Sequence, residues 1–274
     1  MAADASRPET EPAGGFPTPP LVTLFKVIFR KQVIDLTRYP INTASLFLSM
    51  FVFFALIFFG GKAVAGTAIT DSLDGLIVGY FLWTLATRAF RGLASNVMNE
   101  ARWGTLERLF ISPYGLGNVM AVKTIVNISL SVVWSGVMLL AMMFVTGRWL
   151  AVDLLTLLPL SFLTLAPVVG IGFLLAGLAI LYKRVENLFG IVSFGFVGLI
   201  AAPVEQLEPL KLLPMTQGSH LTRRAMEEGI RLWEFPTMEL MYLVIPAVVY
   251  LSVGFYIFHR MQCRARKNGL LGQY

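Results

Sequence analysis

Cysteine, histidine and charged residues are all scarce in this sequence. The 274 residues include one cysteine, Cys263, and two histidines, His220 and His259. A single cysteine excludes a disulfide framework within the chain. The two histidines are expected on opposite sides of a membrane, so we predict no metal site. Charged residues make up only 14% of the chain, against about 25% in soluble domains. This deficit argues against a soluble enzyme and indicates an integral membrane protein.

Long apolar runs account for most of the chain. They predict six membrane spans, at about 41–60, 72–94, 118–146, 152–181, 187–203 and 237–259. A span needs roughly 20 apolar residues to cross about 30 Å of hydrocarbon, and only 187–203 is short. We expect an all-α integral membrane protein with six transmembrane helices, preceded by an amphipathic interfacial helix.

The distribution of basic residues predicts the orientation. With the N-terminus inside, six of the 22 lysines and arginines lie outside and the other 16 lie on the cytoplasmic side. By the positive-inside rule both termini are cytoplasmic, in a plasma or inner membrane. The net charge of +6 is then a topology signal, and no nucleic-acid partner is expected.

The segments outside the spans have distinct compositions. Residues 1–20 are rich in Pro, Ala, Gly and Thr and read as a disordered cytoplasmic tail. Residues 21–39 are amphipathic and predict a helix in the interface, ended by Tyr39-Pro40. The membrane domain covers 21–260, and 261–274 is a basic cytoplasmic tail.

The stretch NEARWGTLERLFISP, residues 99–113, places charge between two apolar spans. As a helix over 100–111, it gathers apolar side chains on one side and polar ones on the other, before Ser112-Pro113 ends it. The apolar side is expected to rest on the membrane domain; it comprises Trp103, Leu106, Leu109 and Phe110. The opposite side is open to a soluble partner; it comprises Glu100, Gly104, Glu107 and Arg108. An ordinary solvated loop helix remains the alternative.

The sequence EARWGTLERLFISP, residues 100–113, resembles the signature of the type-2 ABC exporter permeases. Three further features are similar to the same family: the amphipathic helix before the first span, the proline-containing segment around Pro209 and Pro214, and the basic tail. The resemblance covers nearly the whole chain from residue 21.

The resemblance implies that this segment is a coupling helix received by a separate ATPase subunit. The implied contacts are Glu100, Gly104, Thr105 and Glu107, with Arg108, Ser112 and Pro113 in the same segment. A second, smaller contact would comprise Lys183, Arg184 and Glu186; a positively charged stop between two spans is its alternative. ATP and Mg would be bound by the partner, and this chain would carry no cofactor. A second permease copy or a related permease would complete the path, surrounded by membrane lipids.

The energy source is expected to lie outside this chain. No G-x-x-x-x-G-K-[ST] loop is present, and ionisable residues are nearly absent from the middle of the spans. We therefore expect a permease subunit of an ATP-driven exporter, moving an apolar or amphipathic substrate such as a drug, a lipid or a lipid-linked glycan. The alternative is a membrane-embedded enzyme that modifies lipids or isoprenoids.

The external segment 204–236 is mixed in character. Its apolar first half is interrupted by Pro209 and Pro214; we expect a turn at Gly218-Ser219, then a charged helix over about 221–233. Pro209, Pro214 and His220 are candidates for an external gate, and a passive outer cap is the alternative. We expect spans 72–94 and 187–203 to line the path, with the glycines of 187–203 allowing close helix packing.

Overall fold

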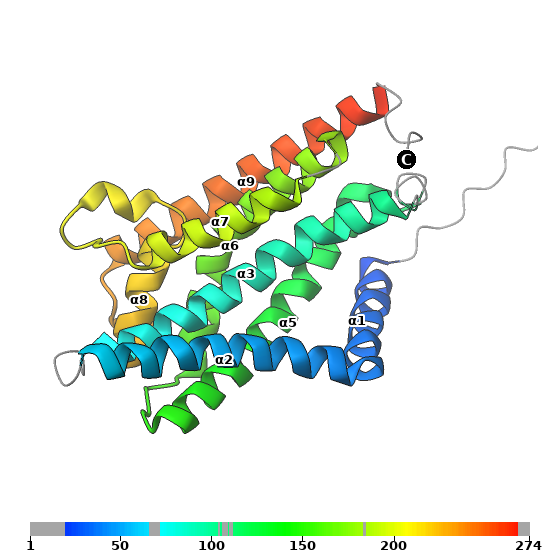
Figure 1. Ribbon diagram of the computed structural model, residues 1–274. Coiled ribbons are helices and arrows are strands. Elements are labelled where there is room, and N and C mark those ends of the chain that lie inside the picture. Colours follow the sequence, from blue (N-terminus) through cyan, green and yellow to red (C-terminus); the bar gives the residue numbers. More distant parts are fainter. Residues whose placement is uncertain are drawn as a thin grey trace, which may run out of the picture.

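The computed structural model describes residues 20–65, 72–103, 105, 109, 112–182 and 185–267. This part of the chain is helical and contains no strand (Figure 1). Its elements are α1 (Leu21–Arg38), α2 (Pro40–Ala65), α3 (Ser72–Arg102), α5 (Gly115–Thr146), α6 (Leu154–Tyr182), α7 (Glu186–Ile200), η2 (Glu208–Leu212), α8 (Thr216–Glu227), η3 (Leu232–Glu234) and α9 (Thr237–Lys267). The predicted 1–20 tail lies outside the described residues except for Pro20.

Four helices are long and apolar enough to cross a membrane, namely α2, α5, α6 and α9. They coincide with four of the six predicted spans and indicate a membrane protein. The other two predicted spans are also helical. α3 has 31 residues but carries charge in its second half, and α7 has only 15 residues. Among the described residues, α3 and α7 therefore do not combine the length and the apolar composition of the other four helices.

The helices run back and forth between two ends of the bundle (Figure 1). α1 lies at the same end as the last residues of α3 and α9. α1 has no buried residue, as expected for an amphipathic helix at an interface. α9 continues to Lys267, so residues 261–267 extend the last helix instead of belonging to a separate tail.

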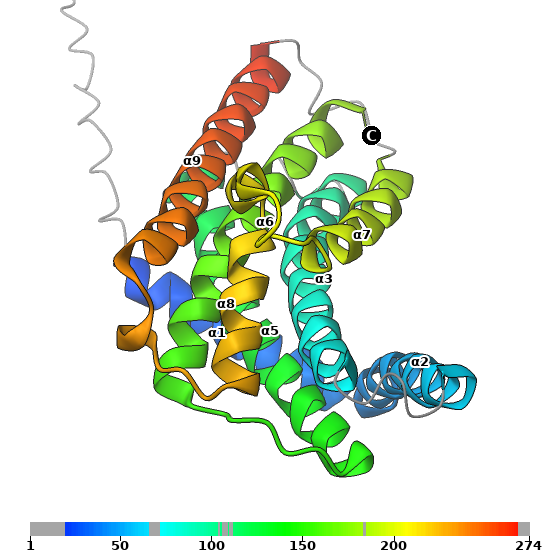
Figure 2. The same cartoon turned by 90° about the vertical axis from the view of Figure 1, so that its left-hand side faces the viewer.

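α6 is the central helix. It is apolar on every side, and its most apolar stretch is 72% buried inside the chain, which is typical of a helix surrounded by others. Glycines bring α6 and α9 into backbone contact: a Cβ on Gly254 would lie 2.1 Å from the carbonyl oxygen of Gly170. α2, by contrast, lies at the periphery (Figure 2), with its most apolar stretch only 11% buried. Its outward side chains suit a lipid environment.

α8 differs from the expected charged helix over 221–233. It begins at Thr216, so Gly218 and Ser219 are helical and do not form a turn. Packing requires glycine at position 218, because a Cβ there would lie 2.1 Å from the hydroxyl of Thr164 on α6. α8 therefore packs into the end of the bundle and is not an exposed loop helix.

Candidate functional site

The connection between α3 and α5 is anchored at Glu100. The Lys123 ammonium on α5 donates a hydrogen bond to Glu100 Oε1 over 2.7 Å. The Thr105 hydroxyl donates to the other carboxylate oxygen, and the Thr105 backbone N–H donates to the Glu100 carbonyl over 3.0 Å. Burial raises the pKa of Glu100, but Lys123 and Thr105 outweigh burial and leave this pKa below its ordinary value. Glu100 is thus a charged anchor for the connection.

This arrangement changes the interpretation of the predicted coupling helix. Residues 100–102 belong to α3 and do not start a separate helix. Glu100, expected on the partner-facing side, is only 15% exposed and points to α5. Trp103, expected to rest on the membrane domain, is 70% exposed. The ion pair with Lys123 accounts for the inward position of Glu100, and this partner, 23 residues away, lies outside the helical pattern of 100–111.

The remaining residues of this connection are only partly described. Gly104, Glu107 and Arg108 lie outside the described residues. Leu109 packs against the buried apolar side chains between α3, α5, α6 and α9, as expected for the apolar side. Ser112-Pro113 leads into a turn, in which the Gly115 N–H donates to the Ser112 carbonyl over 2.9 Å, and α5 follows at once.

The second predicted inner contact lies between α6 and α7. Lys183 and Arg184 are outside the described residues, and Glu186 is the first residue of α7. The predicted gate residues lie at the opposite end of the bundle. Pro209 is exposed within η2, Pro214 is buried before α8, and His220 is half-buried on α8. The structure therefore places the inner and outer candidate residues in separate sites.

An apolar cleft of about 630 Å³ lies between α2, α3, α7 and α8. This volume falls within the range of about 300–1,000 Å³ that is typical of ligand pockets. Its lining comprises Phe53 and Ile57 of α2; Gly75, Leu76, Gly79, Tyr80 and Trp83 of α3; Phe194, Val197 and Ile200 of α7; Ala201; and Arg223 and Glu227 of α8. The cleft can accept an apolar or amphipathic molecule.

Hydrogen bonds from two aromatic residues hold the walls of the cleft. The Trp83 indole N–H donates to the Ser193 carbonyl on α7 over 3.0 Å, and the Tyr80 hydroxyl donates to the Met50 carbonyl on α2 over 2.5 Å. At the end near α8, Arg223 and Glu227 approach within 4.0 Å. Burial raises the pKa of the Glu227 carboxyl above its ordinary value, although Arg223 opposes this effect. The cleft thus combines an aromatic body with a charged end.

The two spans expected to line a path, represented by α3 and α7, do line this cleft. The expected packing role of the α7 glycines is not observed within the chain, because a Cβ on Gly190, Gly195 or Gly198 would meet nothing within 4 Å. The sequence interpretation missed the contribution of α2 and the role of Lys123. A single lysine inside the apolar run 118–146 was the available signal for the latter.

Comparison of the chain with protein-family models and with curated proteins found no match.

Proposed function

We propose that this chain is the membrane-spanning permease subunit of an ATP-driven ABC exporter of type 2. In this proposal a separate ATPase subunit binds ATP and Mg, and residues 99–113 couple its movements to the membrane domain. The substrate is an apolar or amphipathic molecule that leaves the cytoplasm or the inner leaflet. All six predicted spans cross the membrane, and both termini are cytoplasmic.

The observation that supports this proposal most directly is the anchored connection between α3 and α5. Its sequence resembles the coupling segment of the family, and the Glu100–Lys123 pair of 2.7 Å ties its beginning to the next helix. An anchored segment transmits force, whereas a loosely tethered loop would absorb it.

α3 connects the proposed coupling segment to the cleft. The helix is continuous from Ser72 to Arg102. Trp83 in the cleft wall and Glu100 at the anchor are separated along it by roughly 25 Å, at 1.5 Å per residue. A displacement of the connection would therefore move the Tyr80 and Trp83 side of the cleft as part of one rigid element.

A second permease is part of the proposal because one chain of this size does not enclose a wide path. The exposed side of α7 supports a second copy or a related permease. It carries Ile191 and Phe194, which are 68% and 75% exposed, beside glycines with open space around them. Such small residues allow two membrane helices to approach closely.

The ATPase contact is tested with two exposed tryptophans at opposite ends of the bundle. Trp103 is 70% exposed at the proposed coupling segment, and Trp149 is 73% exposed in the connection between α5 and α6. We expect Trp103→Ala to weaken association with the candidate ATPase subunit by about 2 kcal/mol, as for an aromatic anchor in an interface. Trp149→Ala is the matched control and should leave association unchanged.

The measurement is co-purification from membranes, followed by ATPase assays in proteoliposomes with a panel of lipids and drugs. Equal retention of the ATPase by both variants would contradict the proposed coupling surface. Chemical conversion of a lipid or isoprenoid by the chain without an ATPase would instead favour the membrane-embedded enzyme.

A further inference from the structure

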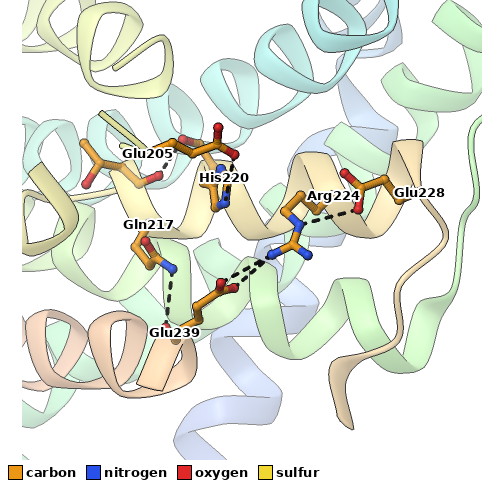
Figure 3. Close-up of polar contacts among 8 residues, drawn as sticks. Glu205, Gln217, His220, Arg224, Glu228 and Glu239 are labelled. Carbon is orange, nitrogen blue, oxygen red and sulfur yellow. Dashed lines mark hydrogen bonds and ion pairs between the residues drawn. The ribbon is translucent and has the colours of Figure 1, made fainter. Parts of the chain in front are cut away.

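A second, polar cavity lies on the other side of α8. It has a volume of about 140 Å³ and lies between α8, η2 and the start of α9. Figure 3 shows Gln217, His220 and Arg224 on α8 with Glu205 and Glu239 around them. Lys211 of η2 also lines the cavity. The apolar cleft is lined by Arg223 and Glu227 instead, so the two cavities contact different faces of the same helix.

Gln217 carries an unsatisfied acceptor at this cavity. Its side chain is 2% exposed, and its Nε2 donates to the backbone carbonyl of Glu239 over 3.5 Å. In this orientation the amide nitrogen faces the Glu239 carbonyl, which only accepts, and the amide oxygen points away from it. Gln217 Oε1 is buried without a hydrogen-bond partner in the structure. An unsatisfied buried acceptor is costly, so a ligand that donates a hydrogen bond there would be favoured.

The charged groups at the cavity are arranged in two sets. Arg224 donates to the Glu239 carboxylate over 3.1 Å and to Glu228 over 3.5 Å, and Lys211 lies over the Tyr242 ring. The five N–H donors of arginine exceed these bonds, which leaves capacity for an anion. Gln217 Oε1 and the carboxylates of Glu239 and Glu205 are acceptors. The cavity therefore offers sites for both a cation and an anion.

His220 also lines the cavity, beside Glu205. Its Nε2 lies 3.9 Å from Glu205. Burial lowers the pKa of His220; Glu205 and Glu239 oppose this effect, and Arg224 and Arg223 reinforce it. The ring is then neutral near neutral pH and does not add a positive charge. In the described part of the chain, no three acidic, histidine or cysteine side chains are placed to hold a metal ion, so an organic ammonium is the better cation.

Exposed apolar side chains lie next in sequence to residues that line the cavity. Leu207 precedes η2 and Leu212 ends it beside Lys211; these leucines are 56% and 52% exposed, and Met238 beside Glu239 is 68% exposed. Apolar groups around a polar pocket are typical of a surface at the lipid headgroup level. These apolar neighbours favour a membrane lipid over a water-soluble molecule as the ligand.

We propose that this cavity binds the headgroup of a phospholipid with a primary ammonium. The ammonium donates to Gln217 Oε1 and contacts the carboxylates of Glu239 and Glu205, while the phosphate is bound by Lys211 and Arg224. The acyl chains lie along the exposed side chains of η2 and α9. This site does not depend on the exporter proposal, because it lies outside the apolar cleft and needs no ATPase.

Binding is tested with purified full-length protein in detergent, by titration with two short-chain lipids. Dihexanoyl phosphatidylethanolamine has ammonium N–H donors, and dihexanoyl phosphatidylcholine has none. We expect the ethanolamine lipid to bind about tenfold more tightly, the effect of one hydrogen bond to a charged group. In Gln217→Leu this ratio should fall to about twofold, the part that an exposed carboxylate such as Glu205 provides. Glu228 bonds to Arg224 but does not line the cavity, so Glu228→Gln is the control and should retain the ratio.

A second variant tests the same site. Glu205 is 79% exposed, so Glu205→Gln should fold normally and reduce the ratio about twofold, as for an exposed charge. If Gln217→Leu does not fold, the result for Glu205→Gln tests the proposed ammonium contact. Equal binding of the two lipids to the unmodified protein, or an unchanged ratio in the folded variants, would overturn the proposal. Free phosphoethanolamine should bind much more weakly than its lipid. Equal affinity would overturn the assignment to a membrane lipid.

Discussion

The ion pair between Glu100 and Lys123 stabilises the fold only while both side chains are charged. They join the end of α3 to the first turns of α5, and their side chains are only 15% and 16% exposed. A charge in such a position is stabilised by its partner and destabilised by the loss of water. Removal of one partner therefore leaves the other poorly solvated, and the connection between the two helices loses its anchor.

The pair predicts how stability depends on pH. The pKa of Glu100 is lower in the folded protein than in a free glutamate. Its contribution is therefore fully present above the ordinary glutamate pKa and is lost as the pH falls through the lower folded value. We expect the thermal unfolding temperature to decrease as the pH falls through this acidic range. Glu100→Gln should make the unfolding temperature less dependent on pH and lower the free energy of unfolding by about 1–3 kcal/mol.

The measurement is thermal unfolding in detergent from about pH 7 down to about pH 3. Glu208 is the control carboxylate, because it is 84% exposed and 3.9 Å from Lys211. Glu208→Gln should leave the profile unchanged. A profile that is identical for Glu100→Gln and the unmodified protein would show that the pair contributes nothing to stability.

At the scale of helices, the contact between α6 and α9 is the least tolerant of change. Because a Cβ on Gly254 would meet the Gly170 carbonyl oxygen at 2.1 Å, Gly254→Ala must move one backbone away from the other. We expect a loss of about 3 kcal/mol, at the upper end of the usual cost of overpacking.

Gly136 of α5 provides the matched control for this contact. A Cβ there would meet nothing within 4 Å, so Gly136→Ala should be neutral or stabilise the helix by up to about 1 kcal/mol. Thermal unfolding of the two variants in the same detergent compares them directly. Equal midpoints would mean that α6 and α9 separate without cost.

The positions of the helices could be predicted from sequence because each long apolar run is a local signal. The predicted 118–146 and 152–181 correspond closely to α5 (Gly115–Thr146) and α6 (Leu154–Tyr182). The start of α8 could not be predicted, because Gly218 has the composition of a turn. Its small size is instead required by Thr164, more than fifty positions earlier in the chain.

The sites were harder to predict than the helices for the same reason. The pairing of Glu100 with Lys123 spans 23 positions and is invisible in a helical pattern of 100–111 alone. The apolar cleft combines residues from four helices, and the sequence indicated only two of them. A polar cavity beside α8 depends on where Gln217 points, which no local pattern specifies.

For the molecule as a whole, the arrangement of the helices predicts which exposed residues can be labelled from each side of the membrane. Cys263 is exposed near the end of α9, and Gln206 is exposed before η2 at the other end of the bundle. In intact cells we expect Gln206→Cys, in a Cys263→Ser background, to react with an impermeant maleimide. Cys263 in the unmodified protein should react only after permeabilisation.

Gln206 is a better choice for this test than Gln217, which lies in the same predicted external segment but is 2% exposed. The buried Gln217→Cys would fail to react on either side and would give no information. Labelling of Cys263 in intact cells, without labelling at position 206, would reverse the orientation and place residues 99–113 away from the cytoplasm.

The shortness of α7 has a consequence for the surrounding bilayer. Its 15 residues rise by only about 22 Å, whereas the hydrocarbon layer is about 30 Å thick. η2 and α8 follow α7 in the chain, and α7 and α8 line the apolar cleft together. If α7 spans the membrane, as in the proposed exporter, a mismatch of this size is expected to thin the adjacent leaflet. A headgroup moving along α7 would therefore meet a shortened barrier and reach water before crossing a full membrane thickness.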